Sequence, residues 1–216
     1  MMDAPVIDAD WADWLDWVAS VFLSPPDADS VALWRSEVTI RLFEAIGIEF
    51  GQQEAGAHIR AALEAGEPHT VALDLSVAYT RLFEGIAGMP AVGLYQAAYT
   101  TDMPAWRLFG QSAQDMAQLL AHARLQLAGA SHEPADHLAV ELALLAALIR
   151  CQDRVVAGQV QQQLQTWLEP FAACCRQHDP HGFYGAVATL LQATPGLALS
   201  HPTVPLSRQE RSFHVE

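Results

Sequence analysis

The stretch HEPADHLAVELALLAALI, residues 132–149, joins a polar segment to an almost uninterrupted apolar one. Glu141 is the only charged residue between Leu138 and Ile149. A helix that is apolar on every side is stable only when other elements surround it, so this stretch predicts a central, buried helix. Pro134 suits the first turn of a helix, where its missing N–H breaks no hydrogen bond. We therefore expect the helix to begin near Pro134, with Asp136 and His137 in its first turn and against the core.

Apolar residues recur at helical spacing along most of the chain. They predict helices over residues 10–23, 30–46, 53–65, 70–84, 105–127, 154–178 and 180–193. In the second of these, the residues expected to face inward are Val31, Trp34, Val38, Leu42 and Phe43. Asp179 is the expected N-cap of the last helix, with Pro180 at its first position.

No alternating strand pattern is present, so the expected fold class is all-α. We expect a single globular helical domain of about eight or more helices over residues 1–194, followed by a loosely ordered tail at 195–216. A glycine-rich loop at 85–93 and a break near 129–133 are candidate hinges.

The composition limits the classes of partner. Acidic residues outnumber basic ones 25 to 11, which gives a formal net charge of −14. This charge repels phosphate backbones and argues against nucleic acid, whereas it favours cationic partners. No apolar run approaches the roughly 20 residues of a membrane helix, and the first residues lack the basic region of a secretory signal. These features predict a cytoplasmic protein without stable membrane insertion.

The sequence offers little for metal, cofactor or catalytic chemistry. His132 and His137 are five residues apart with Pro134 between them, whereas a helical zinc motif needs two histidines four apart. The three cysteines lack CxxC spacing, so we expect reduced thiols. No phosphate-loop lysine and no nucleophile elbow are present, and we therefore predict no cofactor, no metal and no enzyme activity.

His137 and Glu141 are four residues apart and face the same way on a helix. They could form a buried structural couple, or line a groove that receives a cationic group. An alternative function is a small helical enzyme that uses the two residues as an acid–base pair. A further alternative is a scaffold whose acidic surface serves only solubility.

Several segments resemble, in order, the TorD/DmsD family of molybdoenzyme chaperones, and most closely its TorD branch. Glu133 to Leu138, followed by Glu141 and Leu142, resembles the E-P-x-D-H helix entrance of that family. The other matching segments are Tyr79–Phe83, Tyr95–Tyr99 and Phe171–Leu191. The resemblance spans about residues 70–194, and the N-terminal third agrees only as a helical pattern. Leu94 and Ala97 replace the proline and serine that the family usually has there.

The resemblance implies a cytoplasmic chaperone that is not an enzyme. Such chaperones bind the twin-arginine signal peptide of a molybdenum-containing reductase and hold the apo form until its cofactor is inserted, before export. In that family, the positions of Asp136, His137 and the aromatic segment are associated with leader binding, and domain-swapped dimers occur. The expected partners are thus a molybdoenzyme precursor and its leader, bound by a monomer or a domain-swapped homodimer.

A twin-arginine leader presents two guanidinium groups and an apolar stretch, so its receptor needs carboxylates and an apolar groove. Glu133 and Asp136 are the candidate carboxylates. The candidate groove walls are Tyr95, Tyr99, Trp106 and Leu138. With His137 and Glu141, these residues make up the predicted peptide-binding site.

Overall fold

The computed structural model describes residues 5–85, 88–100, 110–123 and 133–194. Over these ranges the chain forms ten α-helices and one π-helical segment, with an isolated β-bridge between Tyr95 and His137. The elements, in chain order, are α1 (Pro5–Leu23), α2 (Ala28–Trp34), α3 (Glu37–Glu49), α4 (Gln53–Leu63), α5 (Pro68–Tyr79), η1 (Thr80–Glu84), α6 (Ala97–Thr100), α7 (Gln111–His122), α8 (Leu138–Arg150), α9 (Arg154–His178) and α10 (Phe183–Ala193). The predicted all-α fold class is confirmed.

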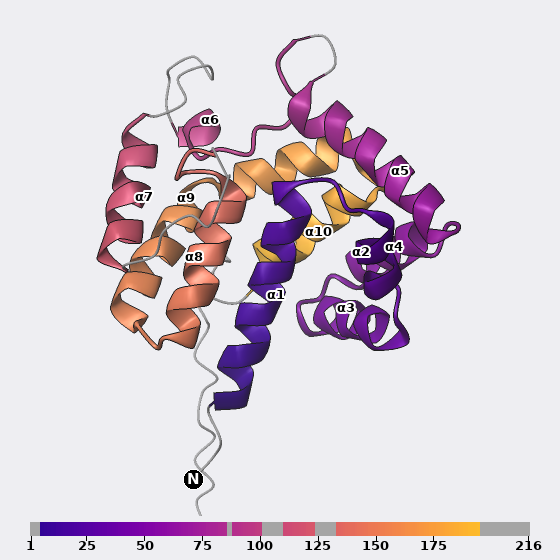
Figure 1. The fold of residues 1–216 in the computed structure, drawn as a ribbon, viewed down its shortest axis with the longest axis horizontal. Coiled ribbons are helices and arrows are strands. Elements are labelled where there is room, and N and C mark those ends of the chain that lie inside the picture. The colour runs from indigo at the N-terminus through magenta and orange to yellow at the C-terminus, as the bar shows by residue number, and fades with distance from the viewer. Residues whose placement is uncertain (1–4, 86–87, 101–109, 124–132, 195–216) are drawn as a thin grey trace, which may run out of the picture.

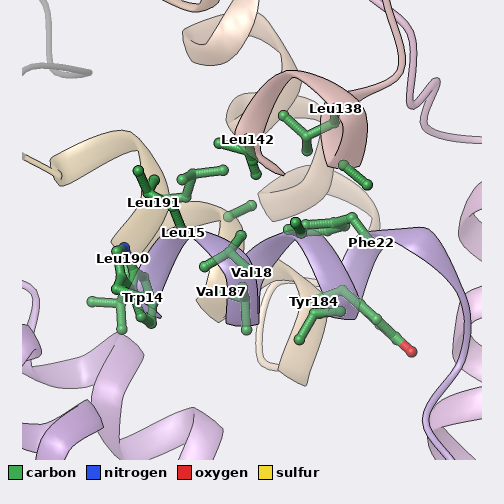
Figure 2. Packing of buried hydrophobic residues seen from close by; sticks show 14 of the residues in the cluster. Trp14, Leu15, Val18, Phe22, Leu138, Leu142, Tyr184, Val187, Leu190 and Leu191 are labelled. Atoms are coloured by element: carbon green, nitrogen blue, oxygen red, sulfur yellow. The ribbon is translucent and has the colours of Figure 1, made fainter. Parts of the chain in front are cut away.

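Helices α1, α8, α9 and α10 enclose the core, with α2 to α5 on one side and α6 and α7 on the other (Figure 1). Apolar side chains from α1, α8 and α10 meet between these helices (Figure 2). They include Trp14, Leu15, Val18, Phe22, Leu138, Leu142, Tyr184, Val187, Leu190 and Leu191. The stretch after residue 137 is therefore the buried central helix that its composition predicted.

The helix predicted over 30–46 is in fact two helices. The Ser36 side chain accepts a hydrogen bond from the Thr39 N–H at 3.3 Å, which caps α3 and makes the break. The Arg35 guanidinium donates to the Gly66 carbonyl at 2.8 Å, which joins the α2–α3 connection to the α4–α5 connection. The prediction that Val38 and Leu42 face inward was wrong, because their side chains are 80% and 50% exposed.

The start of α10 also differs from the sequence prediction. The N-cap is Gly182 rather than Asp179, and the helix begins at Phe183. The Asp179 carboxylate still serves this helix end, because it accepts the Gly185 N–H at 3.1 Å. A Cβ atom on Gly182 would lie 2.1 Å from that carboxylate, so the close approach requires glycine. Arg81 of η1 approaches the same carboxylate at 3.4 Å.

Three sequence predictions fall wholly or mainly outside the described residues: Trp106, most of the 129–133 break, and the tail at 195–216. The hinge and the domain swap stay predictions. In the part of the chain that the structure describes, the cysteines Cys151, Cys174 and Cys175 are free thiols. Among the described helices, none has both the length and the apolar character needed to cross a bilayer.

Candidate functional site

Two segments far apart in the sequence are joined by backbone hydrogen bonds at the entrance of α8. The Leu138 N–H donates to the Leu94 carbonyl at 2.8 Å, and the Gln96 N–H donates to the Asp136 carbonyl at 3.0 Å. Because the segment before Leu138 pairs in this extended way, α8 begins at Leu138 and not near Pro134. Asp136 and His137 therefore precede the first turn, and His137 is the N-cap, whose Nδ1 accepts the Ala139 N–H at 3.1 Å.

The buried Asp136 side chain connects α6 and α7 to the entrance of α8. The residue is 1% exposed. The Oδ2 atom accepts the Ala97 N–H of α6 at 3.3 Å and the Ser112 hydroxyl of α7 at 3.1 Å. The Oδ1 atom is buried and has no hydrogen-bond partner among the described residues. Asp136 thus fixes α6 and α7 against the entrance of α8, and its carboxylate is not at the surface.

Glu133 and Tyr95 form the outer part of the site, and both side chains are half-buried. The Tyr95 hydroxyl donates to Glu133 Oε2 at 2.6 Å. Burial, followed by this hydrogen bond, raises the pKa of Tyr95, so the phenol stays protonated and remains a donor at neutral pH. No ion pair of Glu133 is formed within the described ranges. Glu133 is therefore the accessible carboxylate of the pair that the sequence singled out.

His137 lies below the Tyr95 ring, with the two ring centroids 5.1 Å apart and the planes at 77°. Burial lowers the pKa of His137, and the nearby carboxylates of Glu133 and Asp136 act against that shift. The lowered pKa fits the observed geometry, because only an unprotonated Nδ1 can accept the Ala139 N–H. At neutral pH the site thus holds an uncharged imidazole near the side chains of Glu133 and Asp136.

Glu141 and Leu138 lie in the core, with both side chains 0% exposed. Glu141 Oε2 accepts the Trp167 indole N–H at 3.3 Å, and Oε1 has no partner among the described residues. Burial raises the pKa of Glu141 well above its ordinary value, which favours the neutral acid. Glu141 and His137 form no hydrogen bond with each other: His137 Nδ1 accepts the Ala139 N–H, and Glu141 Oε2 accepts the Trp167 indole N–H. The acid–base arrangement considered from the sequence is not formed.

This burial predicts the pH dependence of stability. The folded chain keeps the proton of Glu141 above the ordinary pKa of 4.5, so this residue's contribution to stability falls as pH rises from there through the raised pKa. Glu141→Gln removes the titration and keeps an acceptor for Trp167. In urea unfolding between about pH 5 and 9, we expect the variant to lose less stability with rising pH than the parent. The exposed Glu169→Gln on α9 is the control. Parallel stability curves for Glu141→Gln and the parent would contradict the buried acid.

Tyr99 is the inner aromatic residue of the site. Its ring stacks on Trp167 with centroids 5.7 Å apart, and its hydroxyl donates to the Gly93 carbonyl at 2.8 Å. The replacements at 94 and 97 leave the local connections intact, because Leu94 and Ala97 take part through backbone atoms.

The structure brings together seven of the eight predicted site residues, in two layers; Trp106 lies outside the described residues. The outer layer holds the three half-buried residues, Glu133, Tyr95 and Tyr99; Tyr99 is the one that stacks on the buried Trp167. The buried layer holds Asp136, His137, Leu138 and Glu141. Sequence reasoning missed Ser112 and Trp167, which donate hydrogen bonds to the buried carboxyl groups of Asp136 and Glu141. A serine at a helix start and a lone tryptophan carry no signal that identifies such partners.

Within the described residues, no group of three or more histidine, cysteine, aspartate or glutamate side chains could hold a metal ion. The arrangement at the entrance of α8 is suited to a different task. An oriented carboxylate beside an aromatic ring can bind a guanidinium group through hydrogen bonds and charge.

A family model described as the nitrate reductase delta subunit matches residues 50–179. A segment of 98 residues is 38% identical to the chaperone protein TorD of Escherichia coli O45:K1 (strain S88 / ExPEC), covering 41% of this chain and 49% of that one. The match therefore spans about half the length of that relative. The TorD chaperone of Shewanella sp. (strain ANA-3) is 28% identical over 181 residues, or 82% of this chain and 86% of that one.

A solved structure shares the fold. It is that of a candidate redox enzyme maturation protein from Archaeoglobus fulgidus, with a TM-score of 0.55 and 20% sequence identity. The similarity covers 88% of this chain and 93% of the other. The arrangement of helices is thus shared across most of both chains.

Proposed function

Because the chain belongs to the nitrate reductase delta subunit family, also known as the TorD family, we propose that it is a chaperone for a molybdoenzyme. It binds the twin-arginine leader and the apo form of a reductase in the cytoplasm and supports cofactor insertion before export. The chaperones and the maturation protein to which the chain is similar support this role. In this proposal the chain has no catalytic activity of its own.

The observation that carries the proposal is the half-exposed Glu133 carboxylate, held by the Tyr95 hydroxyl at the mouth of α8. Tyr95 occupies one oxygen, Oε2, while Oε1 makes no hydrogen bond within the described residues. A leader guanidinium can donate to Oε1 and lie against the Tyr95 ring. The negative charge of the chain attracts the cationic leader during encounter.

The buried residues of the site support this contact from below. Asp136 is buried and positions the junction of α6, α7 and α8 through its hydrogen bonds to Ala97 and Ser112. His137 holds the first turn of α8 and packs under Tyr95. Leu138 packs in the core, and Glu141 connects α8 to α9 by accepting the Trp167 indole N–H. We therefore assign the direct leader contact to Glu133 and Tyr95, and positioning roles to the buried residues.

Co-purification from the native cells tests this function. The expected result is a molybdoenzyme precursor whose leader is uncleaved. Calorimetry with a synthetic twin-arginine leader peptide and a twin-lysine version provides the second measurement, because only arginine presents the fork that fits a carboxylate and an aromatic face. Equal affinity for both peptides, together with no molybdoenzyme in the purified complex, would remove the proposal.

The charge state of His137 predicts the pH dependence of leader binding. Since burial lowers its pKa, His137 is neutral at pH 7 and gains its positive charge only below the ordinary value of 6.5. A positive charge beneath Tyr95 repels the leader's arginines, so the affinity should fall as the pH is lowered through that range. Leader calorimetry at about pH 5.5, 6.5 and 8 measures this. His137→Gln should have a flatter profile, and an equally steep decline in that variant would assign the effect to another group.

A further inference from the structure

Helix α3 lies beside α1, on the side away from α6 and α7 (Figure 1). Side chains of α1 and α3 line an open, mainly apolar groove. Its volume is about 460 Å³. The lining residues come only from these two helices: Trp11, Asp13, Trp14, Trp17, Thr39, Leu42, Phe43, Ile46 and Glu49. The groove is therefore separate from the residues proposed to bind the leader.

Aromatic packing makes the base of this groove rigid. Trp17 lies on Phe43 with ring centroids 4.5 Å apart, and Trp14 meets the same ring edge-on at 6.5 Å. Trp14 is anchored further, because its indole N–H donates to the Thr194 hydroxyl at 3.1 Å. A preformed base of this kind loses little conformational entropy when a partner binds.

The exposed apolar surface continues along α3 beyond the groove. Leu42 lines the groove and is half exposed, and Val38 lies one turn earlier with 80% of its surface exposed. Single exposed apolar residues are ordinary, but a run of them beside a tryptophan-lined groove marks an interaction surface. A groove between two helices can receive a third helix that has an apolar face.

The charges around the groove indicate the nature of its occupant. The ionisable residues of the lining are Asp13 and Glu49, both acidic. Asp13 is paired with Arg150 of α8, while Glu49 is exposed and forms no ion pair within the described ranges. A second copy of this chain would bring acidic rims together under a net charge of −14, whereas a basic partner would neutralise them.

We propose that the α1–α3 groove docks an amphipathic helix of a partner protein, with its apolar face on Trp17 and Leu42 and with arginine or lysine residues beside Asp13 and Glu49. This docking surface is additional to the leader site. It gives the chain a second point of attachment, so a client held at both surfaces would bind with increased effective affinity.

Calorimetry with a synthetic helix tests the surface. The probe is a capped peptide of about 18 residues in which leucines repeat at i, i+3, i+4 and i+7 between flanking arginines. A second peptide has the same composition with the leucines scattered round the helix. We expect the first peptide to bind, and Leu42→Glu to weaken binding by about tenfold or more. Glu49→Gln should weaken it by about threefold and reduce its salt dependence.

Two variants serve as matched controls and separate this surface from the proposed function. Val155→Glu changes an apolar residue on α9 that is 76% exposed and outside the groove, and Glu133→Gln changes the leader site. Both should keep the affinity for the probe within about twofold. Far-UV circular dichroism checks that Leu42→Glu folds, which is expected because that side chain is half exposed.

Three results would overturn the proposal. The first is equal binding of the scattered peptide, or of the probe to Leu42→Glu. The second is a homodimer in sedimentation velocity that Leu42→Glu dissociates, because the occupant would then be a second copy. The third is a much tighter affinity for the probe in a chain that ends at Thr194, because residues 195–216 would then be the natural occupant.

Discussion

Phe22→Ala is expected to lower the free energy of unfolding by about 3–5 kcal/mol, the range for removing a buried phenylalanine. Phe22 is 0% exposed, and its ring meets Phe83 of η1 at 5.7 Å and Phe171 of α9 at 5.4 Å. Tyr184 of α10 lies 6.3 Å away. The substitution therefore leaves a cavity where α1, η1, α9 and α10 meet. Because the interior is close-packed, these elements cannot all move inward to fill it.

Thermal and urea unfolding measure this effect. For a chain of this size the melting temperature should fall by about 6–20 °C. Leu33→Ala on α2 is the control, because that side chain is 68% exposed and its loss should change stability by less than about 0.5 kcal/mol. Similar losses in the two variants would mean that Phe22 is not at the centre of the core.

Asp136→Ala is expected to cost about 2–3 kcal/mol, the range for losing hydrogen bonds to a buried charged group. The substitution leaves the Ala97 N–H and the Ser112 hydroxyl without their acceptor. Because these groups hold α6 and α7 to the entrance of α8, leader affinity should fall along with stability. The loss of leader affinity should thus follow the disordering of the site rather than the loss of a contact.

Asp136→Asn separates the loss of the hydrogen bonds from the loss of the carboxylate, because the amide keeps an acceptor oxygen but has no acidic group. It should recover most of the stability lost in Asp136→Ala. Asp74→Ala removes an exposed carboxylate on α5 and should be within about 0.5 kcal/mol of the parent. A fully stable Asp136→Ala that has lost leader binding would contradict the positioning role and favour a direct contact.

The sequence predicted the helices because their apolar periodicity is long and regular, and it predicted the buried α8 from composition alone. It placed the start of α8 four residues too early. The preference of proline for the first turn of a helix reflects local geometry only. The helix begins at Leu138 because the residues before it are hydrogen-bonded to residues 94–96. A contact across about forty residues of chain is invisible to a local pattern.

The division of the site into layers could not be predicted either. Glu133 and Asp136 are alike in chemistry and only three residues apart, yet one is half-exposed and the other buried. The difference depends on Ser112 and Ala97, which the fold brings in from elsewhere. Trp11, Trp14 and Trp17 of α1 line the groove between α1 and α3. This groove depends on the exposed Leu42, which the pattern had placed inside.

Calorimetry of Glu133→Gln with a twin-arginine leader peptide tests the central claim most directly. The substitution keeps the size of the side chain and an acceptor for the Tyr95 hydroxyl, while it removes the charge offered to the guanidinium. The account predicts unchanged thermal stability and a loss of affinity of about 1.5–3 kcal/mol, or about tenfold to hundredfold, with a weaker salt dependence. Unchanged affinity and salt dependence in the folded variant would contradict it.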